Sequence, residues 1–194
     1  MLIIPTILKF AGPLAKRTST DFIILHHAAA LTADVDMIHK WHLERKFLGF
    51  GYNFLVRKSG EIFTGRPIDA ADADAFGHNF DSLSICFEGD FDRESMSNTQ
   101  MQAGVDLIRY LLGLYPQVKS VVRHKDVDKT SCPGKNFPDQ LVLDGYYTLE
   151  RALETLKVEG IINTPEYWKE QVRTVEHLDD FIFGVAKYIR RTKA

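Results

Sequence analysis

The sequence predicts an α/β domain followed by a helical extension. Short apolar runs typical of strands alternate with amphipathic helical segments up to about residue 140, and this alternation is typical of α/β architecture. Beyond Tyr146 only helical patterns follow. A chain of 194 residues is long enough for one domain with a proper core and a small appendage. We therefore expect two parts, residues 1–146 as the main domain and residues 147–194 as the extension.

The main domain is expected to begin with an arm, a strand and a helix. Residues 1–20 resemble an extended N-terminal arm. Residues 22–25 are fully apolar, which favours a buried central strand that ends at His26. Residues 32–45 show the spacing of an amphipathic helix. One face of this helix carries Val35, Ile38, Trp41 and His42.

A β-hairpin and a further strand are predicted next. Residues 52–57 and residues 61–64 have strand character, and they flank the turn Lys58-Ser59-Gly60. This arrangement predicts a hairpin. Residues 82–87 are predicted to form another strand. The chain is therefore expected to have formed most of its sheet by residue 87.

A second helix and a short strand complete the pattern of the main domain. The segment Thr99-Gln100-Met101-Gln102 resembles a capping box and is expected to open the helix. The helix is expected to end near Gly113 and Pro116, because glycine is common at helix ends and proline cannot continue a helix. Val121 and Val122 then form a short strand that leads into His124.

The extension is expected to hold two helices. Residues 147–158 and residues 165–191 have helical patterns, and Pro165 suits the first helical turn. Its apolar stripes leave two alternatives open, namely packing against the main domain or forming a homodimer. Aromatic side chains at helical spacing are expected to be core residues rather than platforms for sugars: Tyr146, Tyr147, Tyr167, Trp168, Phe181, Phe183 and Tyr188.

Composition and charge limit the partners of the chain. The formal net charge of −2 argues against bulk electrostatic binding to nucleic acid or to an anionic membrane. No stretch of the sequence is long enough to span a membrane. The N-terminal segment is apolar, but Pro5 and Lys9 interrupt it, so it does not resemble a signal peptide. We therefore expect synthesis in the cytoplasm without a standard export signal.

The two cysteines are expected to have separate fates, although a single disulfide between them is an alternative. Cys86 lies in Leu-Ser-Ile-Cys-Phe, which is predicted to be a core strand, and a free cysteine there behaves as a small hydrophobic residue. Cys132 lies in a polar segment directly before Pro133 and Gly134. A cysteine in this environment is well placed to bind a metal.

His26, His124 and Cys132 are the candidate metal ligands. His26 ends a buried strand, and His124 and Cys132 belong to one polar segment. Two imidazoles and one thiolate form a ligand set for zinc that leaves the fourth position open for water. An open position indicates a catalytic metal rather than a structural one.

Periodicity leaves alternatives open around this set. His27 follows His26 directly, and successive strand residues face opposite sides, so only one of the two can face a given site. A structural zinc site would need a fourth protein ligand, which Asp126, Asp128 or His27 could supply. The other histidines are expected to be polar residues with satisfied hydrogen bonds: His39, His42, His78 and His177.

Several separated motifs occur in a characteristic order along the chain. They are Ile-Leu-His26-His27, Gly51-Tyr52-Asn53-Phe54, Gly65-Arg66, the segment from Asn79 to Ile85, and His124 with Thr130-Ser131-Cys132-Pro133. In this order they resemble the zinc-dependent N-acetylmuramoyl-L-alanine amidases. These are the type-2 group, which includes amidase-type phage lysozymes and peptidoglycan recognition proteins.

The resemblance covers roughly residues 20–142, and it implies a fold with a central mixed β-sheet flanked by helices. It implies that zinc is bound by His26, the first histidine of the pair, together with His124 and Cys132. It also assigns Tyr52 and Thr130 to catalysis. Hairpin alternation alone would make Tyr52 a packed strand residue. We take as a hypothesis that Tyr52 donates a hydrogen bond to the developing oxyanion and that Thr130 holds the same oxygen or the zinc-bound water.

One departure from the family pattern concerns Asp74. Members often carry Gly-x-His-Ala before the Asn-x-x-Ser segment, and this chain has Asp72-Ala73-Asp74-Ala75 there. Asp74 therefore stands where a histidine is common. The departure affects the expected contacts to the glycan or to the stem peptide.

The resemblance implies hydrolysis of the amide bond between N-acetylmuramic acid and L-alanine in bacterial peptidoglycan, as performed by a phage or prophage endolysin. Such an enzyme would act on the cell wall after release from the cytoplasm, and residues 147–194 could bind the wall. Two alternatives are a cytoplasmic amidase that recycles wall fragments and a non-catalytic peptidoglycan-binding protein. Recycling relatives usually have an aspartate as the third ligand, and inert members have typically lost the cysteine, so Cys132 speaks against both.

Overall fold

The computed structural model describes residues 1–146, 149–172 and 174–193. The chain divides into two compact units, Met1–Val142 and Leu143–Ala194. Each unit contains a cluster of buried apolar side chains.

The first unit is built on a six-stranded sheet with the order β1-β4-β3-β5-β2-β6. Strands β3 and β4 pair antiparallel as a hairpin, and the other neighbouring pairs are parallel. The expected α/β fold with a mixed sheet is therefore confirmed. The strands are β1 (Ile3–Ile4), β2 (Phe22–His27), β3 (Phe54–Val56), β4 (Ile62–Thr64), β5 (Ser82–Phe87) and β6 (Ser120–Arg123).

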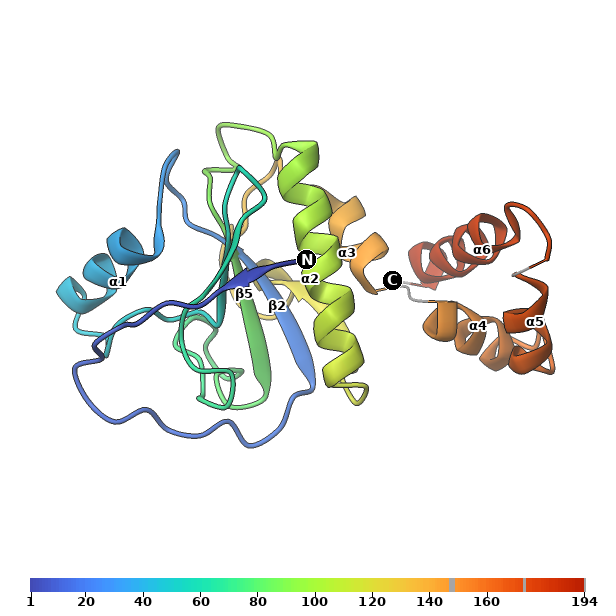
Figure 1. Ribbon diagram of the computed structural model, residues 1–194, viewed down its shortest axis with the longest axis horizontal. Helices are drawn as coiled ribbons and strands as arrows, with labels where there is room; N and C mark the ends of the chain where they lie inside the picture. Colours follow the sequence, from blue (N-terminus) through green and yellow to red (C-terminus); the bar gives the residue numbers. More distant parts are fainter. Residues whose placement is uncertain (147–148, 173, 194) are drawn as a thin grey trace. The chain divides into compact units, whose positions relative to one another are not determined.

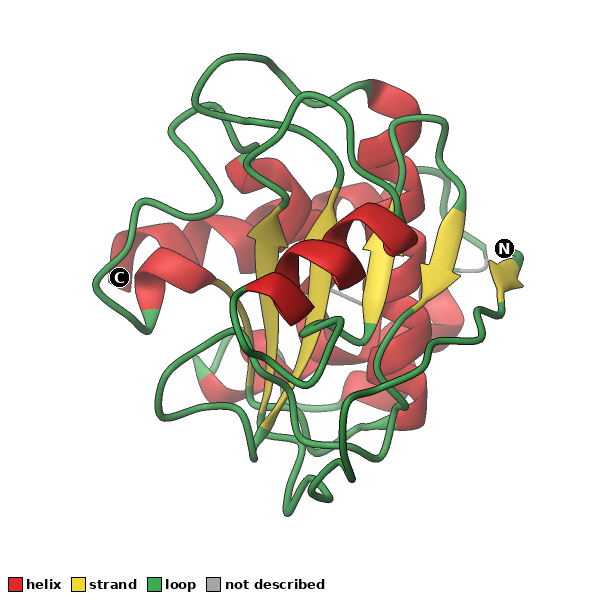
Figure 2. Ribbon diagram, turned by 90° about the vertical axis from the view of Figure 1, so that its left-hand side faces the viewer, coloured by secondary structure: helices red, strands yellow, loops and turns green. Residues whose placement is uncertain are grey.

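Helices cover both faces of this sheet. Figures 1 and 2 show α1 (Val35–Glu44) lying on one face and α2 (Asn98–Leu114) on the other. On the α1 face, Val35 and Ile38 pack with Leu55 and Cys86 of the central strands. The remaining elements of this part of the chain are the 3-10 helix η1 (His124–Asp126) and α3 (Asp139–Tyr146).

On the α2 face, the helix approaches the sheet closely at Gly104. A Cβ atom at this position would lie 2.6 Å from the ring of Phe87. Phe87 ends β5 and is fully buried. The missing side chain of Gly104 therefore lets α2 pack directly on the aromatic ring.

The start of α2 differs from the prediction by two residues. The helix cap is Ser97, whose hydroxyl accepts a hydrogen bond from the backbone N–H of Gln100 at 3.1 Å. Thr99, the expected cap, lies inside the helix. The Gln100 side chain donates instead to the carbonyl oxygens of Val56 and Glu88. The polar residue at the third helical position thus joins α2 to the strands, a long-range role that the local pattern does not reveal.

The second unit begins within α3 at Leu143. It also contains the helices α4 (Leu149–Val158), α5 (Pro165–Gln171) and α6 (Leu178–Lys193). The prediction of one helix over residues 165–191 is wrong, because the chain breaks between α5 and α6. Both helices pack against α4, and one straight helix could not place both halves there. The buried core of the unit comprises Ala152, Leu153, Leu156, Ile162, Ile182 and Ala186.

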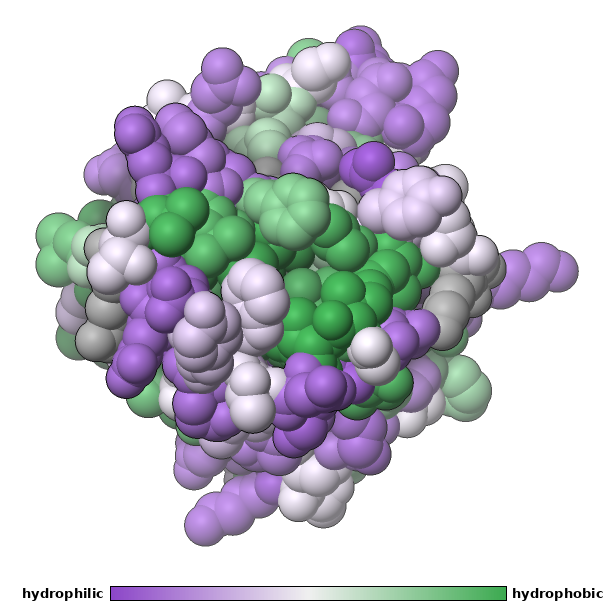
Figure 3. Space-filling view, turned by 90° about the vertical axis from the view of Figure 1, so that its right-hand side faces the viewer, coloured by the Kyte–Doolittle hydropathy of each residue, from purple (hydrophilic) through white to green (hydrophobic). Residues whose placement is uncertain are grey.

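The aromatic residues of this unit differ in their burial. Trp168 and Phe183 pack against the apolar core, as expected. Tyr167, Phe181 and Tyr188 are exposed by 55%, 65% and 68%, so their prediction as core residues is wrong. Figure 3 shows the surface coloured by hydropathy, and apolar residues, drawn in green, form part of the face that it presents. Tyr146 and Tyr147 lie outside the described side chains.

Among the described residues, no helix combines the length and the apolar character that crossing a bilayer requires.

Candidate metal centre and active site

Strand register decides which histidine of the pair faces the candidate site. His26 pairs with Cys86, and His27 pairs with Phe87 in the neighbouring strand. Residues in register share a face of the sheet. Cys86 belongs to the cluster on the α1 face, whereas Phe87 lies against Gly104 of α2. His26 therefore faces the α1 side.

His26, His124 and Cys132 come together at the carboxyl end of the parallel strands. His124 directly follows β6, and β6 pairs in parallel with β2. His26 and His124 therefore lie at the same end of the sheet, the carboxyl end of these two strands. The ligand atoms of the three residues all lie within 4.8 Å of one another. Nδ1 of His26 lies 3.8 Å from Sγ of Cys132.

This donor set fits zinc. Zn–N and Zn–S distances of about 2.0 and 2.3 Å in a tetrahedral site separate the nitrogen and sulfur ligands by about 3.5 Å, close to the observed 3.8 Å. Both cysteines are free thiols, so the alternative disulfide is absent. Two neutral imidazoles and one thiolate are ligands that zinc prefers.

The alternative fourth ligands have other partners. Nδ1 of His27 accepts a hydrogen bond from the backbone N–H of Phe91 at 3.2 Å. Asp126 accepts hydrogen bonds from Arg123. Asp128 lies 3.4 Å from Nε2 of His124 but does not belong to the cluster. Within the described residues, the metal cluster consists of three side chains, and three ligands leave a position open.

The other histidines are satisfied, as expected. His39 and His42 each accept a backbone N–H at Nδ1, from Phe50 and Gly51 respectively. The remaining two pair with nearby carboxylates, His78 with Asp81 and His177 with Asp180.

Tyr52 lies beside the candidate ligands. Its ring centroid is 5.1 Å from that of His26. The turn before it is tightly packed, because a Cβ atom on Gly51 would lie 2.7 Å from the carbonyl oxygen of Ala73. Burial, and then the neighbouring Cys86 and Asp74, raise the pKa of Tyr52 well above its ordinary value. The phenol therefore stays protonated at neutral pH and can donate a hydrogen bond.

Thr130 lies in the loop that carries Cys132. Its Oγ1 accepts a hydrogen bond from the backbone N–H of Cys132 at 3.2 Å, so the hydroxyl proton is available for another acceptor. This bond fixes the backbone of Cys132, which carries the thiol.

Burial dominates the electrostatics of the metal-free site. It lowers the pKa of His26 well below the ordinary value, and the nearby His124 adds to this effect. It raises the pKa of the Cys132 thiol to about 12 and that of Asp74 to about 7. His26 is therefore neutral, which is the form that binds a metal, and a bound cation would favour the Cys132 thiolate.

The candidate site lies at a pocket of about 550 Å³. Tyr52, Thr130 and the three candidate ligands all line it. Trp41 and Arg45 also line it, and sequence reasoning did not assign them to the site. They lie one turn apart in and just after α1, so the spacing of four residues was the available signal.

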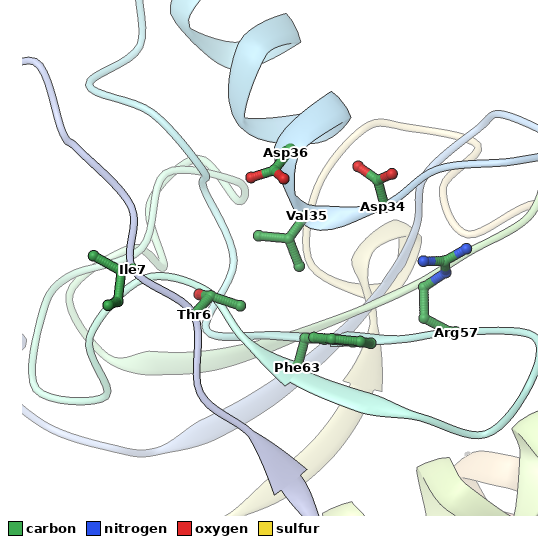
Figure 4. Close-up of a pocket in the computed structure, with 7 residues that line it drawn as sticks. All are labelled: Thr6, Ile7, Asp34, Val35, Asp36, Arg57 and Phe63. Atoms are coloured by element: carbon green, nitrogen blue, oxygen red, sulfur yellow. The ribbon is translucent and has the colours of Figure 1, made fainter.

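A second pocket, of about 350 Å³, lies where the N-terminal arm passes the start of α1 (Figure 4). Two of its three charged side chains, Asp34 and Arg57, already have structural roles, and the third, Asp36, lies in the first turn of α1. Asp34 caps α1 by accepting from the backbone N–H of Met37, and Arg57 pairs with Glu88. This pocket therefore offers no comparable site.

Comparison with known proteins agrees with this geometry. The sequence profile of the N-acetylmuramoyl-L-alanine amidases matches residues 16–135. The endolysin of Enterobacteria phage K11 is 31% identical over 127 residues, which cover 61% of this chain and 82% of the relative. The amidase LysC from Clostridium intestinale is 34% identical with a TM-score of 0.70, and the match covers 73% of this chain and 95% of LysC.

A more distant structure shares the fold. Bumblebee peptidoglycan recognition protein SA has a TM-score of 0.66 at 22% identity, and the match covers 72% of this chain and 93% of that protein. The family profile spans more than half of the chain and includes all three candidate ligands together with Tyr52 and Thr130. The chain therefore belongs to the N-acetylmuramoyl-L-alanine amidase family.

Proposed function

We propose that this enzyme uses zinc to hydrolyse the amide bond between N-acetylmuramic acid and L-alanine in bacterial peptidoglycan. The observation that carries the proposal is the cluster of His26, His124 and Cys132 at the wall of an open pocket. Zinc, when bound, supplies a Lewis acid and lowers the pKa of a coordinated water to about 7.

Tyr52 is proposed to stabilise the negative charge that develops on the amide oxygen. A buried phenol with a raised pKa remains a hydrogen-bond donor over the whole range of working pH. Its ring lies next to that of His26, and Tyr52 lines the same pocket as the three candidate ligands. Removing one donor of this kind typically costs about 2.7–4 kcal/mol of transition-state stabilisation.

Thr130 is proposed to act on the same oxygen or on the attacking water. Its hydroxyl accepts the N–H of Cys132, which leaves its proton free to be donated into the pocket. The same bond fixes the loop that carries the thiol. Thr130 thus links substrate contact to the position of a ligand.

We propose that the enzyme acts as a phage-type endolysin on the cell wall. The phage endolysins among its relatives support this role over that of a wall-recycling amidase. A non-catalytic binding role is less well supported, because His26, His124 and Cys132 form a complete ligand set beside Tyr52 and Thr130.

We propose that residues 1–146 form the catalytic domain and that residues 147–194 bind the wall. The compact unit Leu143–Ala194, with exposed Phe181 and Tyr188, supports this division. A homodimer through the C-terminal helices is the alternative. Comparing wall binding and sedimentation of the full chain with those of a chain that ends at Tyr146 would distinguish the two roles.

The proposed activity can be tested with purified peptidoglycan. Release of new N-terminal alanine is measured for the protein as isolated, after chelation, and after zinc is added back. The expected result is about one zinc per chain, loss of release on chelation and recovery with zinc.

His124→Ala provides the matching variant, and His177→Ala is its control. His177 is an exposed histidine of the second unit. His124→Ala should lose both zinc and activity, whereas His177→Ala should keep both. Zinc binding without hydrolysis in the unaltered protein would favour the non-catalytic alternative.

A further inference from the structure

Asp74 is a buried carboxylate, and neither of its oxygens makes a hydrogen bond of normal geometry among the described residues. Its side chain is 1% exposed, and it lies in the loop before β5. An unpaired buried carboxylate lowers the stability of a folded protein. Its presence at the pocket wall therefore requires a physical explanation.

The group that faces Asp74 is His26. Oδ1 of Asp74 lies 3.8 Å from Nε2 of His26, and this nitrogen also has no hydrogen-bond partner within the described part of the chain. The other ring nitrogen, Nδ1, lies 3.8 Å from Sγ of Cys132. One side of the imidazole thus faces the candidate metal position and the other side faces a carboxylate.

Histidines that bind a metal usually donate the N–H of the second ring nitrogen to a carboxylate, a carbonyl or a water. This contact fixes the tautomer and the ring orientation. We infer that Asp74 is a positioning residue, which holds the His26 ring with Nδ1 toward the metal and so raises the affinity of the site for zinc. The inference rests on the proposed function, because that function assigns zinc to His26.

Asp72 provides a matched control. It is a second buried carboxylate in the same loop, and its oxygens also have no hydrogen-bond partner among the described residues. The ion pairs of the described residues do not place it against a histidine. Replacing Asp72 therefore tests the effect of removing buried charge from this loop without removing the contact to His26.

The experiment compares full-length Asp74→Ala, Asp74→Asn and Asp72→Asn with the unaltered protein. Zinc dissociation constants are measured by competition with a chromophoric chelator, and thermal midpoints are measured on the metal-free proteins. We expect Asp74→Ala to weaken zinc binding about 10- to 100-fold. Asp74→Asn keeps an oxygen acceptor and should recover part of this loss. Asp72→Asn should leave the dissociation constant unchanged.

The metal-free thermal midpoint separates positioning from a structural role. Removing an unpaired buried carboxylate should leave the midpoint of Asp74→Ala unchanged or higher, whereas a structural role predicts a lower midpoint. Unchanged zinc affinity in Asp74→Ala would overturn the inference while the proposed function stands. Equal weakening in Asp72→Asn would also overturn it. If the unaltered protein does not bind zinc, the proposed function fails together with the inference.

Discussion

His42 makes a specific prediction about stability at mildly acidic pH. The side chain is 7% exposed, and its Nδ1 accepts the backbone N–H of Gly51 at 2.9 Å, directly before Tyr52. Burial, with the positive charge of Arg45, lowers the pKa of His42 from 6.5 to about 4. The folded protein therefore keeps this histidine neutral at pH values where the unfolded chain binds a proton.

The sign and the size of the effect follow from proton linkage. Above pH 6.5 His42 is neutral in both states, so its contribution to stability is complete. As the pH falls toward 4, the unfolded state gains a proton that the folded state does not, and the free energy of unfolding decreases. Each pH unit within this window costs about 1.4 kcal/mol, so the loss between pH 7.5 and pH 5 is about 2 kcal/mol.

The assay uses His42→Asn, because the Asn Oδ1 can accept the Gly51 N–H and does not titrate. Urea unfolding is followed by Trp41 fluorescence in a Trp168→Phe background, since the two tryptophans lie in different units. Measurement with chelator present removes any contribution from a bound metal. The other titrating groups contribute equally to both proteins. Their contributions therefore cancel in the difference in unfolding free energy between the unaltered chain and the variant. A difference that stays constant from pH 7.5 to pH 5 would refute the reasoning.

Three further predictions concern catalysis and packing. Tyr52→Phe should keep zinc and lower kcat roughly 100- to 1000-fold; near-full activity in a peptidoglycan hydrolysis assay would rule out the oxyanion role. Glu88 accepts hydrogen bonds from Arg57 and from the backbone N–H groups of Lys58 and Ala33, and these outweigh burial to hold its pKa below the ordinary value. Glu88→Ala should therefore cost about 1–3 kcal/mol in urea unfolding at pH 7, because it leaves these donors without their acceptor, and the cost should shrink as the pH falls below about 4.5. Gly51→Ala should lower both the unfolding free energy by about 1–3 kcal/mol and the activity, because its Cβ would lie 2.7 Å from a carbonyl oxygen; an unchanged melting curve would contradict this.

Local patterns predict the elements of the first unit well. The segments 22–25 and 82–87 correspond to β2 and β5, and the hairpin is formed by β3 and β4. The prediction of β2 succeeds because a strand buried on both faces is largely apolar. Strand β5 also buries Ser82 and Ser84, and the Ser84 hydroxyl accepts a hydrogen bond from the backbone N–H of Asn53. The break between α5 and α6 has no comparable local signal, since only packing against α4 requires it.

The candidate site is predictable in its residue types and less so in its geometry. The order of the motifs indicates His26, His124 and Cys132, but the choice between His26 and His27 depends on strand register, which pairs His26 with Cys86. The approach of Asp74 to His26 depends on how a loop folds over the sheet. Such long-range contacts are absent from a periodicity pattern.

The most direct test of the central claim is zinc X-ray absorption on the zinc-loaded protein. Coordination by His26, His124 and Cys132 predicts one sulfur scatterer at about 2.3 Å and nitrogen or oxygen scatterers at about 2.0–2.1 Å. The sulfur signal should disappear in Cys132→Ser. A zinc shell that contains only nitrogen and oxygen in the unaltered protein would contradict the account.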